Sequence, residues 1–99
     1  MNKTIVVSGK RKTSIAKAWI KEGTGKVIIN NAPYENLSKF RKLRIEEPLD
    51  IARKQGSLNF DISVKVKGGG KESQIEASRL AIARAILAFT KSEQIKRDF

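Results

Sequence analysis

The sequence contains no cysteine and no histidine. Without thiols the chain can form no disulfide bond and offers no thiolate nucleophile, and without imidazole it lacks the commonest general base and metal ligand. Its longest apolar run has five residues, from Ala85 to Phe89, whereas a transmembrane helix needs about 20. No N-terminal targeting segment is recognisable either. These absences predict a cytoplasmic protein with no membrane segment, no metal site, no cofactor and none of the usual catalytic groups.

What the sequence does have is positive charge. Lys and Arg number 21 against ten Asp and Glu, which leaves a formal net charge of +11 and a sequence pI near 10.3. Residues 1–44 carry eleven of these cations against two Glu, a net charge of +9, and residues 45–99 carry ten against eight, a net charge of +2. Such an asymmetry indicates a surface that binds a polyanion.

The size of the chain limits its organisation. With 99 residues, of which 39% are apolar, it can build one modest core and has no room for a second. We therefore expect a single globular domain over residues 1–99.

Alternating side chains and turn residues predict four strands, over residues 4–7, 13–21, 26–30 and 60–67. The second strand places Trp19 on its solvent side with Lys17 and Lys21. Gly-Thr-Gly at residues 23–25 favours a hairpin to the third strand, and Pro33 is expected to end that ladder because proline has no N–H to donate. The core side of the second strand carries Ala16, Ala18 and Ile20.

Charge and proline predict the first helix. Glu46 and Glu47 before Pro48 are typical of a helix start, because the helix dipole favours anions there and proline loses no hydrogen bond. The helix is expected over residues 48–55, with Gly56 ending it. Residues 36–40 are expected to form only a loose turn.

A second, longer helix is predicted over residues 74–90, where Ser73 and Glu76 have the spacing of a capping box. Leu80 and Leu87 lie opposite its main apolar stripe and need a second partner. Residues 91–99 predict a short third helix capped by Ser92. The elements together predict an α/β fold of two layers, with helices covering one face of a sheet. The apolar stripe of the long helix consists of Ile75, Ile82, Ile86 and Phe89.

Two glycine-bearing segments are candidate phosphate-binding sites. The first is residues 9–13, Gly-Lys-Arg-Lys-Thr, a basic loop between two strands where cations can meet a nucleic-acid backbone. Its alternative is a solvated basic turn. The second is residues 65–71, where three glycines precede a helix N-terminus that attracts anions; its alternative is a flexible turn. No Walker pattern or G-x-G-x-x-G is present. The candidate binding residues are Lys10, Arg11, Lys12, Thr13, Lys67, Gly68, Gly69, Gly70 and Lys71.

Three other side chains keep two interpretations each. Trp19 can stack on a base or cover a neighbouring chain, or simply pack on lysine stems. Arg79 and Arg84 on the long helix can be solubilising cations, or clamps for a phosphate or carboxylate. The carboxylates at residues 46, 47 and 50 are explained by helix-start electrostatics and do not require a metal.

Five stretches, in this order and spacing, resemble one family. The first four are SGKRKTSIAKA at residues 8–18, GTGKVIINNAP at 23–33, EEPLDIA at 46–52 and DISVKVKGGG at 61–70. The fifth is Q-x-x-A-x-R-x-A-I-A-R-A-I at residues 74–86. The chain is thus similar to the small ribosomal subunit protein nine family, in its archaeal and eukaryotic form.

The resemblance implies a structural, non-enzymatic protein of the small-subunit head, which binds the 3′ major domain of the rRNA and neighbouring head proteins. It also implies the family's fold: a two-layer sandwich of a four-stranded mixed sheet with helices on one face. The crossover is left-handed, as in domain two of ribosomal protein five and in a class of small-molecule kinases. By the same resemblance residues 10–13 form the rRNA-contacting loop and residues 68–70 the glycine turn beside it. On the helix behind them lie Gln74, Arg79 and Arg84.

Two departures from the family pattern change these expectations. Ser73 stands where the family often has glycine before the glutamine, so a side chain rather than bare backbone opens the helix. Family members also continue into a basic tail that reaches tRNA, and this sequence ends at Phe99 before it. A contact with tRNA is therefore not expected of the residues present. The alternatives to a ribosomal role are an RNA-binding module acting off the ribosome and, less favoured, a phosphotransferase of the same fold.

Overall fold

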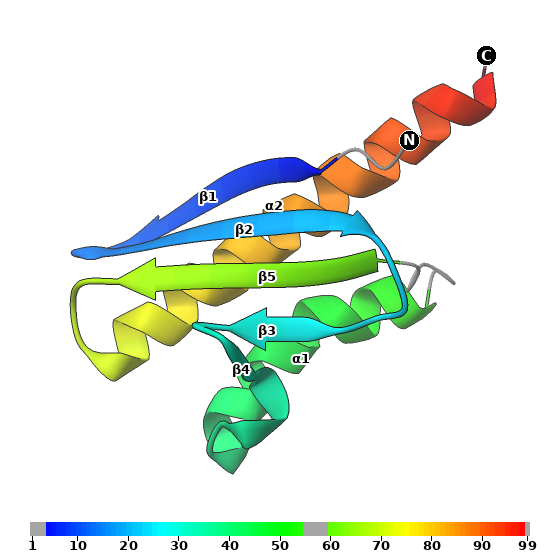
Figure 1. The fold of residues 1–99 in the computed structure, drawn as a ribbon. Coiled ribbons are helices and arrows are strands. Elements are labelled where there is room, and N and C mark those ends of the chain that lie inside the picture. Colours follow the sequence, from blue (N-terminus) through cyan, green and yellow to red (C-terminus); the bar gives the residue numbers. More distant parts are fainter. Residues whose placement is uncertain (1–3, 55–59, 99) are drawn as a thin grey trace.

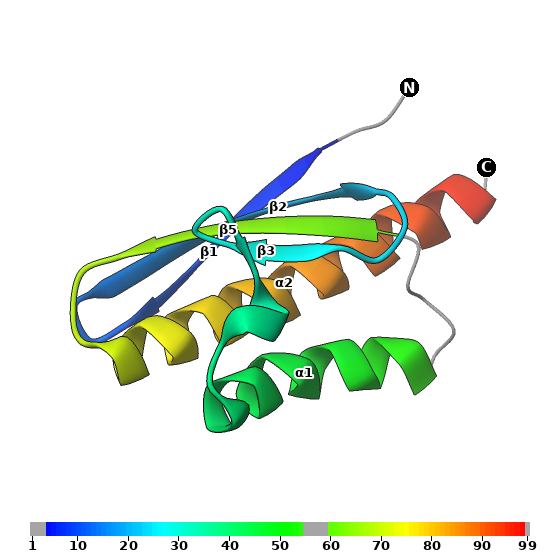
Figure 2. The same ribbon diagram turned by 60° about the horizontal axis from the view of Figure 1, so that its bottom comes forward.

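The computed structural model describes residues 4–54 and 60–98, whose five strands form one sheet in the order β1-β2-β5-β3-β4. Both helices lie on the same face of this sheet, which leaves the other face open (Figures 1 and 2). The α/β sandwich of two layers is confirmed, but the sheet has five strands where four were expected. The elements in chain order are β1 (Ile5–Arg11), β2 (Ser14–Glu22), β3 (Val27–Ile29), β4 (Ala32–Pro33), a 3₁₀ turn (Tyr34–Asn36), α1 (Lys39–Lys54), β5 (Phe60–Lys67) and α2 (Lys71–Asp98).

β5 lies between β2 and β3, so the expected hairpin of these two strands is wrong. β5 pairs antiparallel with β2 and parallel with β3. The Gly-Thr-Gly segment instead passes over the end of β5, where the Asp61 carboxylate accepts hydrogen bonds from the backbone N–H groups of Thr24 and Lys26, each at 3.0 Å. These donors stabilise the charged form and lower the pKa of Asp61 below its usual range.

The connection from β3 through α1 to β5 is left-handed. β3 and β5 point the same way, α1 lies behind the sheet in Figure 1, and the chain moves from β3 up to β5. Turning the molecule places α1 clearly below the sheet (Figure 2). The left-handed connection agrees with the fold that the family resemblance implied. It is an exception to the general rule, because crossovers between parallel strands are nearly always right-handed.

Asn30 and Asn31 form a tight turn that continues the sheet past β3. Their φ angles are 50° and 67°, the left-handed region that asparagine tolerates, and Ala32 and Pro33 then pair back with β3. The expectation that Pro33 ends the ladder is therefore wrong. β4 is the edge strand, where the N–H that proline lacks has no partner to lose.

α1 begins at Lys39, nine residues before the expected start, and Pro48 lies inside it. Proline removes one hydrogen bond and crowds the preceding turn, but Ile45, Leu49 and Pro48 are buried against the rest of the protein. Tertiary packing thus overrides the local signal. Glu46 and Glu47 occupy the middle of α1 rather than its start, and the predicted end at residues 55 and 56 lies outside the described residues.

α2 is one continuous helix of 28 residues, where two were expected. It starts at Lys71, so Ser73 lies in the first turn and its predicted capping box with Glu76 is wrong. Glu76 instead pairs with Arg44 of α1. The predicted cap at Ser92 is wrong too, because the helix continues through that residue.

The predicted core faces are confirmed. The ring of Phe89 on α2 meets that of Phe60 edge-on, with centroids 5.7 Å apart. Leu80 is half-buried near α1, whereas Leu87 remains 59% exposed. Within residues 4–54 and 60–98, no helix combines the length and apolar character that crossing a membrane requires. The predicted core side chains that are buried are Ala16, Ala18, Ile20, Ile75, Ile82 and Phe89, with Ile86 packed against them.

Gly9 allows α2 to cross β1 closely, which predicts that Gly9→Ala is destabilising. A Cβ there would lie 2.7 Å from both the Ala77 carbonyl oxygen and the Ala81 nitrogen. We expect a loss of about 1–3 kcal/mol in the free energy of unfolding, measured with urea. Gly70→Ala is the control: nothing lies within 4 Å of its Cβ, so its stability should change by less than about 0.5 kcal/mol. Equal losses would contradict the close crossing.

Asp61→Asn tests the carboxylate that holds residues 24 and 26. Because the folded state lowers the pKa of Asp61, its stabilisation is complete above about pH 4 and disappears as the pH falls through the folded-state pKa. Urea unfolding should therefore show wild type more stable than the variant near neutral pH, with the difference vanishing in acid. Asp50→Asn removes an equal charge from an exposed pair with Arg53 and should cost less at neutral pH. A pH-independent difference for Asp61 would contradict this account.

Candidate nucleic-acid interface

The tip of the β1–β2 hairpin contacts the glycine turn between β5 and α2. Ser14, which is fully buried, donates from its hydroxyl to the Gly68 carbonyl oxygen at 2.7 Å. Its oxygen also lies 2.8 Å from the hydroxyl of Ser73. The two basic segments are thus joined at one end of the sheet, as the resemblance implied.

Two glycines make this junction possible. Gly68 and Gly69 have φ angles of 83° and 65°, which side-chain-bearing residues rarely adopt. A Cβ on Gly68 would collide with the Thr13 carbonyl oxygen, and one on Gly69 with the Ser14 hydroxyl. Gly70 has open space around it. The turn is therefore packed against the hairpin tip at Gly68 and Gly69.

β1 extends four residues further than expected, and this separates the three consecutive cations of the hairpin. β1 ends at Arg11 and β2 begins at Ser14, so only Lys12 and Thr13 form the turn, with Lys12 at φ 55°. Alternation along β1 directs Lys10 to the open face of the sheet and Arg11 to the helix side, where Arg11 borders a groove beside Glu76. The expected basic loop is therefore a hairpin end with cations on both faces.

Gln74 and the flanking lysines complete the glycine turn. The side-chain amide of Gln74 donates to the Gly68 carbonyl oxygen at 3.1 Å, so this glutamine braces the turn from the first part of α2. Ser73 has a single hydroxyl hydrogen, which it donates either to the Ser14 oxygen at 2.8 Å or to the Gly70 carbonyl oxygen at 3.1 Å. Lys67 and Lys71 are exposed on either side of the glycines.

Arg79 and Arg84 lie further along α2 than the glycine turn, and Arg79 shares a groove with Arg11. They follow Lys71 by about 12 Å and 20 Å along α2, at about 1.5 Å per residue. Arg79 binds the carboxylates of Glu47 at 2.6 Å and Glu76 at 3.5 Å, so it is a carboxylate clamp between the helices. Arg84 donates to the Ser8 carbonyl oxygen at 3.0 Å and thereby ties α2 to the edge strand.

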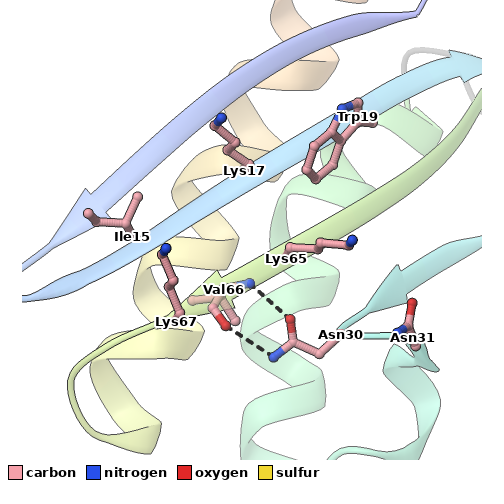
Figure 3. A pocket seen from close by; sticks show the side chains of 8 residues that line it. All are labelled: Ile15, Lys17, Trp19, Asn30, Asn31, Lys65, Val66 and Lys67. Carbon is pink, nitrogen blue, oxygen red and sulfur yellow. Dashed lines mark hydrogen bonds between the residues drawn. The ribbon is translucent and has the colours of Figure 1, made fainter.

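Lys17, a cation that we did not select, lies on the open sheet face beside Lys65 of the second candidate segment. Lys17 of β2 is directly opposite Lys65 of β5, and both border a shallow hollow of about 570 Å³ together with Trp19 (Figure 3). Period-two alternation already put Lys17 and Trp19 on one side of their strand. The pairing of β2 with β5, which brings Lys65 alongside, is a long-range contact that no local pattern reveals.

The described residues contain no cluster of metal-ligating side chains. Among them no group of three or more carboxylates is placed to hold a metal ion. The carboxylates of Glu47, Glu72 and Glu76 instead face arginines across the α1–α2 seam. Fold and surface together define a class: a small, strongly basic α/β domain whose cations gather at a hairpin, a glycine turn and an open sheet face.

Comparison with known proteins narrows this class to one family. The family model for ribosomal protein S9/S16 matches residues 9–99. The chain is 48% identical over 102 aligned residues to small ribosomal subunit protein uS9 of Desulfurococcus amylolyticus, covering 98% of this chain and 69% of the relative. It is 42% identical over 98 residues to uS9 of Methanococcus maripaludis strain C7, covering 98% and 72%. The chain belongs to the ribosomal protein S9/S16 family.

Ser14→Ala tests the junction between the hairpin and the glycine turn. Removing the hydroxyl eliminates its bonds to Gly68 and Ser73, so the free energy of unfolding should fall by about 1 kcal/mol. Ser63→Ala is the matched control because Ser63 is exposed on the open sheet face, and it should change stability by less than about 0.5 kcal/mol. Urea unfolding of both variants provides the measurement. A Ser14 variant as stable as the Ser63 variant would contradict the junction.

Proposed function

We propose that this protein is a structural constituent of the small ribosomal subunit and acts in the cytoplasm by binding and stabilising small-subunit rRNA. The observation that carries the proposal is membership of the ribosomal protein S9/S16 family over residues 9–99 together with the cationic edge formed by the hairpin and glycine turn. Curated relatives that cover 98% of this chain are small-subunit ribosomal proteins. The domain over residues 1–99 serves as one rRNA-binding unit.

The cationic edge suits a phosphate backbone. Lys12 and Thr13 stand at the hairpin tip, and Lys67 and Lys71 flank the glycines, all of them exposed. The start of α2 adds backbone N–H groups and the positive end of the helix dipole. Such contacts position a protein on RNA and release counterions, with little reading of base sequence.

Not every residue that the family resemblance selected has the same role in this proposal. Lys10, Arg11, Lys12 and Lys71 act on phosphates, while Gly68, Gly69 and Gln74 shape the turn that carries them. Arg79 and Arg84 contact groups of the protein itself, namely carboxylates and a backbone carbonyl. The rRNA region is the 3′ major domain, and the protein neighbours are other proteins of the subunit head.

Two alternatives receive less support. A phosphotransferase needs carboxylates for Mg²⁺ and a phosphate loop, and the acidic side chains of the helix seam are already paired with arginines. We therefore propose a non-enzyme. An RNA-binding module that acts off the ribosome would use the same edge, and co-sedimentation with small subunits in high salt separates it from a ribosomal constituent.

The double variant Arg11→Gln with Lys12→Gln tests the edge. Each lost phosphate contact should reduce the slope of log affinity against log salt by about one, so this pair should reduce it by about two. The measurement is binding to a transcript of the small-subunit 3′ major domain at several salt concentrations. Wild type itself should lose about a thousandfold or more in affinity between roughly 50 and 200 mM salt if it makes six or more such contacts.

The matched control is Lys26→Gln with Lys54→Gln, which removes the same charge from the start of β3 and the end of α1. In Figure 1 the start of β3 and the end of α1 lie at the side of the sheet away from the β1–β2 hairpin turn. The salt slope of this control should remain close to that of wild type. The proposed edge is wrong if the control pair weakens binding as much as the hairpin pair, and the rRNA-binding role is wrong if affinity barely changes with salt.

A further inference from the structure

The open face of the sheet carries four lysines that form no ion pair among the side chains that the structure describes. Strand pairing sets Lys17 directly opposite Lys65 and places Lys67 opposite Ile15, with Lys10 on the other side of Ile15. None of these four lysines takes part in an ion pair among residues 4–54 and 60–91. Like charges directly across a strand pair are destabilising, so a bound anion would relieve a cost that the free protein carries.

The side chain of Trp19 lies among these lysines. Trp19 is half-buried, and its cross-strand neighbour on β5 is the small Ser63, which leaves the indole ring uncovered on that side. Ile15 of β2, which is 44% exposed, adds apolar surface to the same face beyond Lys17. Figure 3 shows Trp19, Lys17 and Lys65 around one hollow on this face.

The two asparagines of the β3–β4 turn, Asn30 and Asn31, line one side of the hollow. The amide of Asn30 binds the backbone of Val66 twice: it accepts from the Val66 N–H at 2.9 Å and donates to the Val66 carbonyl oxygen at 3.2 Å. It thereby fixes the turn against β5. Asn31 is exposed at the same border and provides an amide that can both donate to and accept from a base edge.

We propose that this face binds unpaired RNA: one base stacks on Trp19, and the adjoining phosphates contact Lys17, Lys65 and Lys67. The proposal rests on the proposed function and deepens it, because it adds a second surface, for single-stranded nucleotides, to the phosphate-binding edge. Stacking on aromatic rings combined with a cationic surface is the general means of holding single strands. An acidic protein surface would match the charge but would have no use for an uncovered indole ring among the lysines.

The test uses the intrinsic fluorescence of the whole 99-residue protein, since Trp19 is its only tryptophan. An oligouridylate of about ten nucleotides should quench this fluorescence on binding. An RNA duplex of the same length, polyphosphate and polyglutamate carry the charge without unpaired bases, and each should quench far less at equal occupancy.

Variants separate stacking from charge, with binding followed by the anisotropy of a labelled oligouridylate. Trp19→Leu keeps an apolar residue but removes the ring, and it should weaken binding about tenfold or more. Trp19→Phe retains an aromatic ring and should recover most of that loss, which also controls for folding. Lys17→Gln with Lys65→Gln should weaken binding of every polyanion tested.

The proposal is overturned if Trp19→Leu binds oligouridylate as tightly as wild type, or if polyglutamate or polyphosphate quenches as strongly as the single strand. Its failure is distinguishable from failure of the proposed function. If Trp19→Leu has no effect but the double variant Arg11→Gln with Lys12→Gln still lowers the salt slope, only the site on the sheet face is refuted. If Trp19→Leu weakens binding as expected but the double variant leaves the salt slope unchanged, only the phosphate-binding edge at the hairpin is refuted.

Discussion

The structure depends on a close approach of backbone to backbone between α2 and the β1–β2 hairpin. Gly9 lets α2 cross β1 with no side chain between them, and Gly68 and Gly69 let the turn before α2 lie against the hairpin tip. Ser14, with no exposed surface, joins the two by its hydroxyl. Because these contacts leave no space for side chains, the ends of β1, β2 and β5 and the start of α2 form one rigid edge, which carries the exposed cations.

Charge is divided between two faces of the molecule by the same architecture. On the helix side, arginines of α1 and α2 meet carboxylates across the seam, as in the pairs of Arg44 with Glu76 and Arg79 with Glu47. On the open sheet face, Lys17 stands directly opposite Lys65, and neither forms an ion pair with a carboxylate in the described chain. Ion pairs thus engage most acidic side chains of the helices within residues 39–54 and 71–91. The excess of positive charge is concentrated where it is available to a polyanion.

Local patterns predicted the elements whose signals are periodic. Alternation identified β5 and the buried side of β2, and the 3.6-residue period identified the α2 stripe, because burial on one face repeats at the period of the backbone. Boundaries set by tertiary contacts were missed. Pro48 indicated a helix start, yet burial of Ile45 and Leu49 holds α1 together through it. The candidate site was found as two separate segments, and a false grouping of Lys10 with Arg11 arose because β1 continues further than its apolar residues indicate.

The sequence by itself determined the chemistry of this protein: no thiol, no imidazole, a charge of +11 and a cationic N-terminal half, to which motif order added the family. The tertiary structure alone decided which cations act together. Placement of β5 between β2 and β3 put Lys65 opposite Lys17, and folding of α2 onto α1 assigned Arg79 to carboxylates. The physical reason is that composition and short-range spacing are properties of the chain, whereas strand order and helix docking arise from burying surfaces that are distant in sequence.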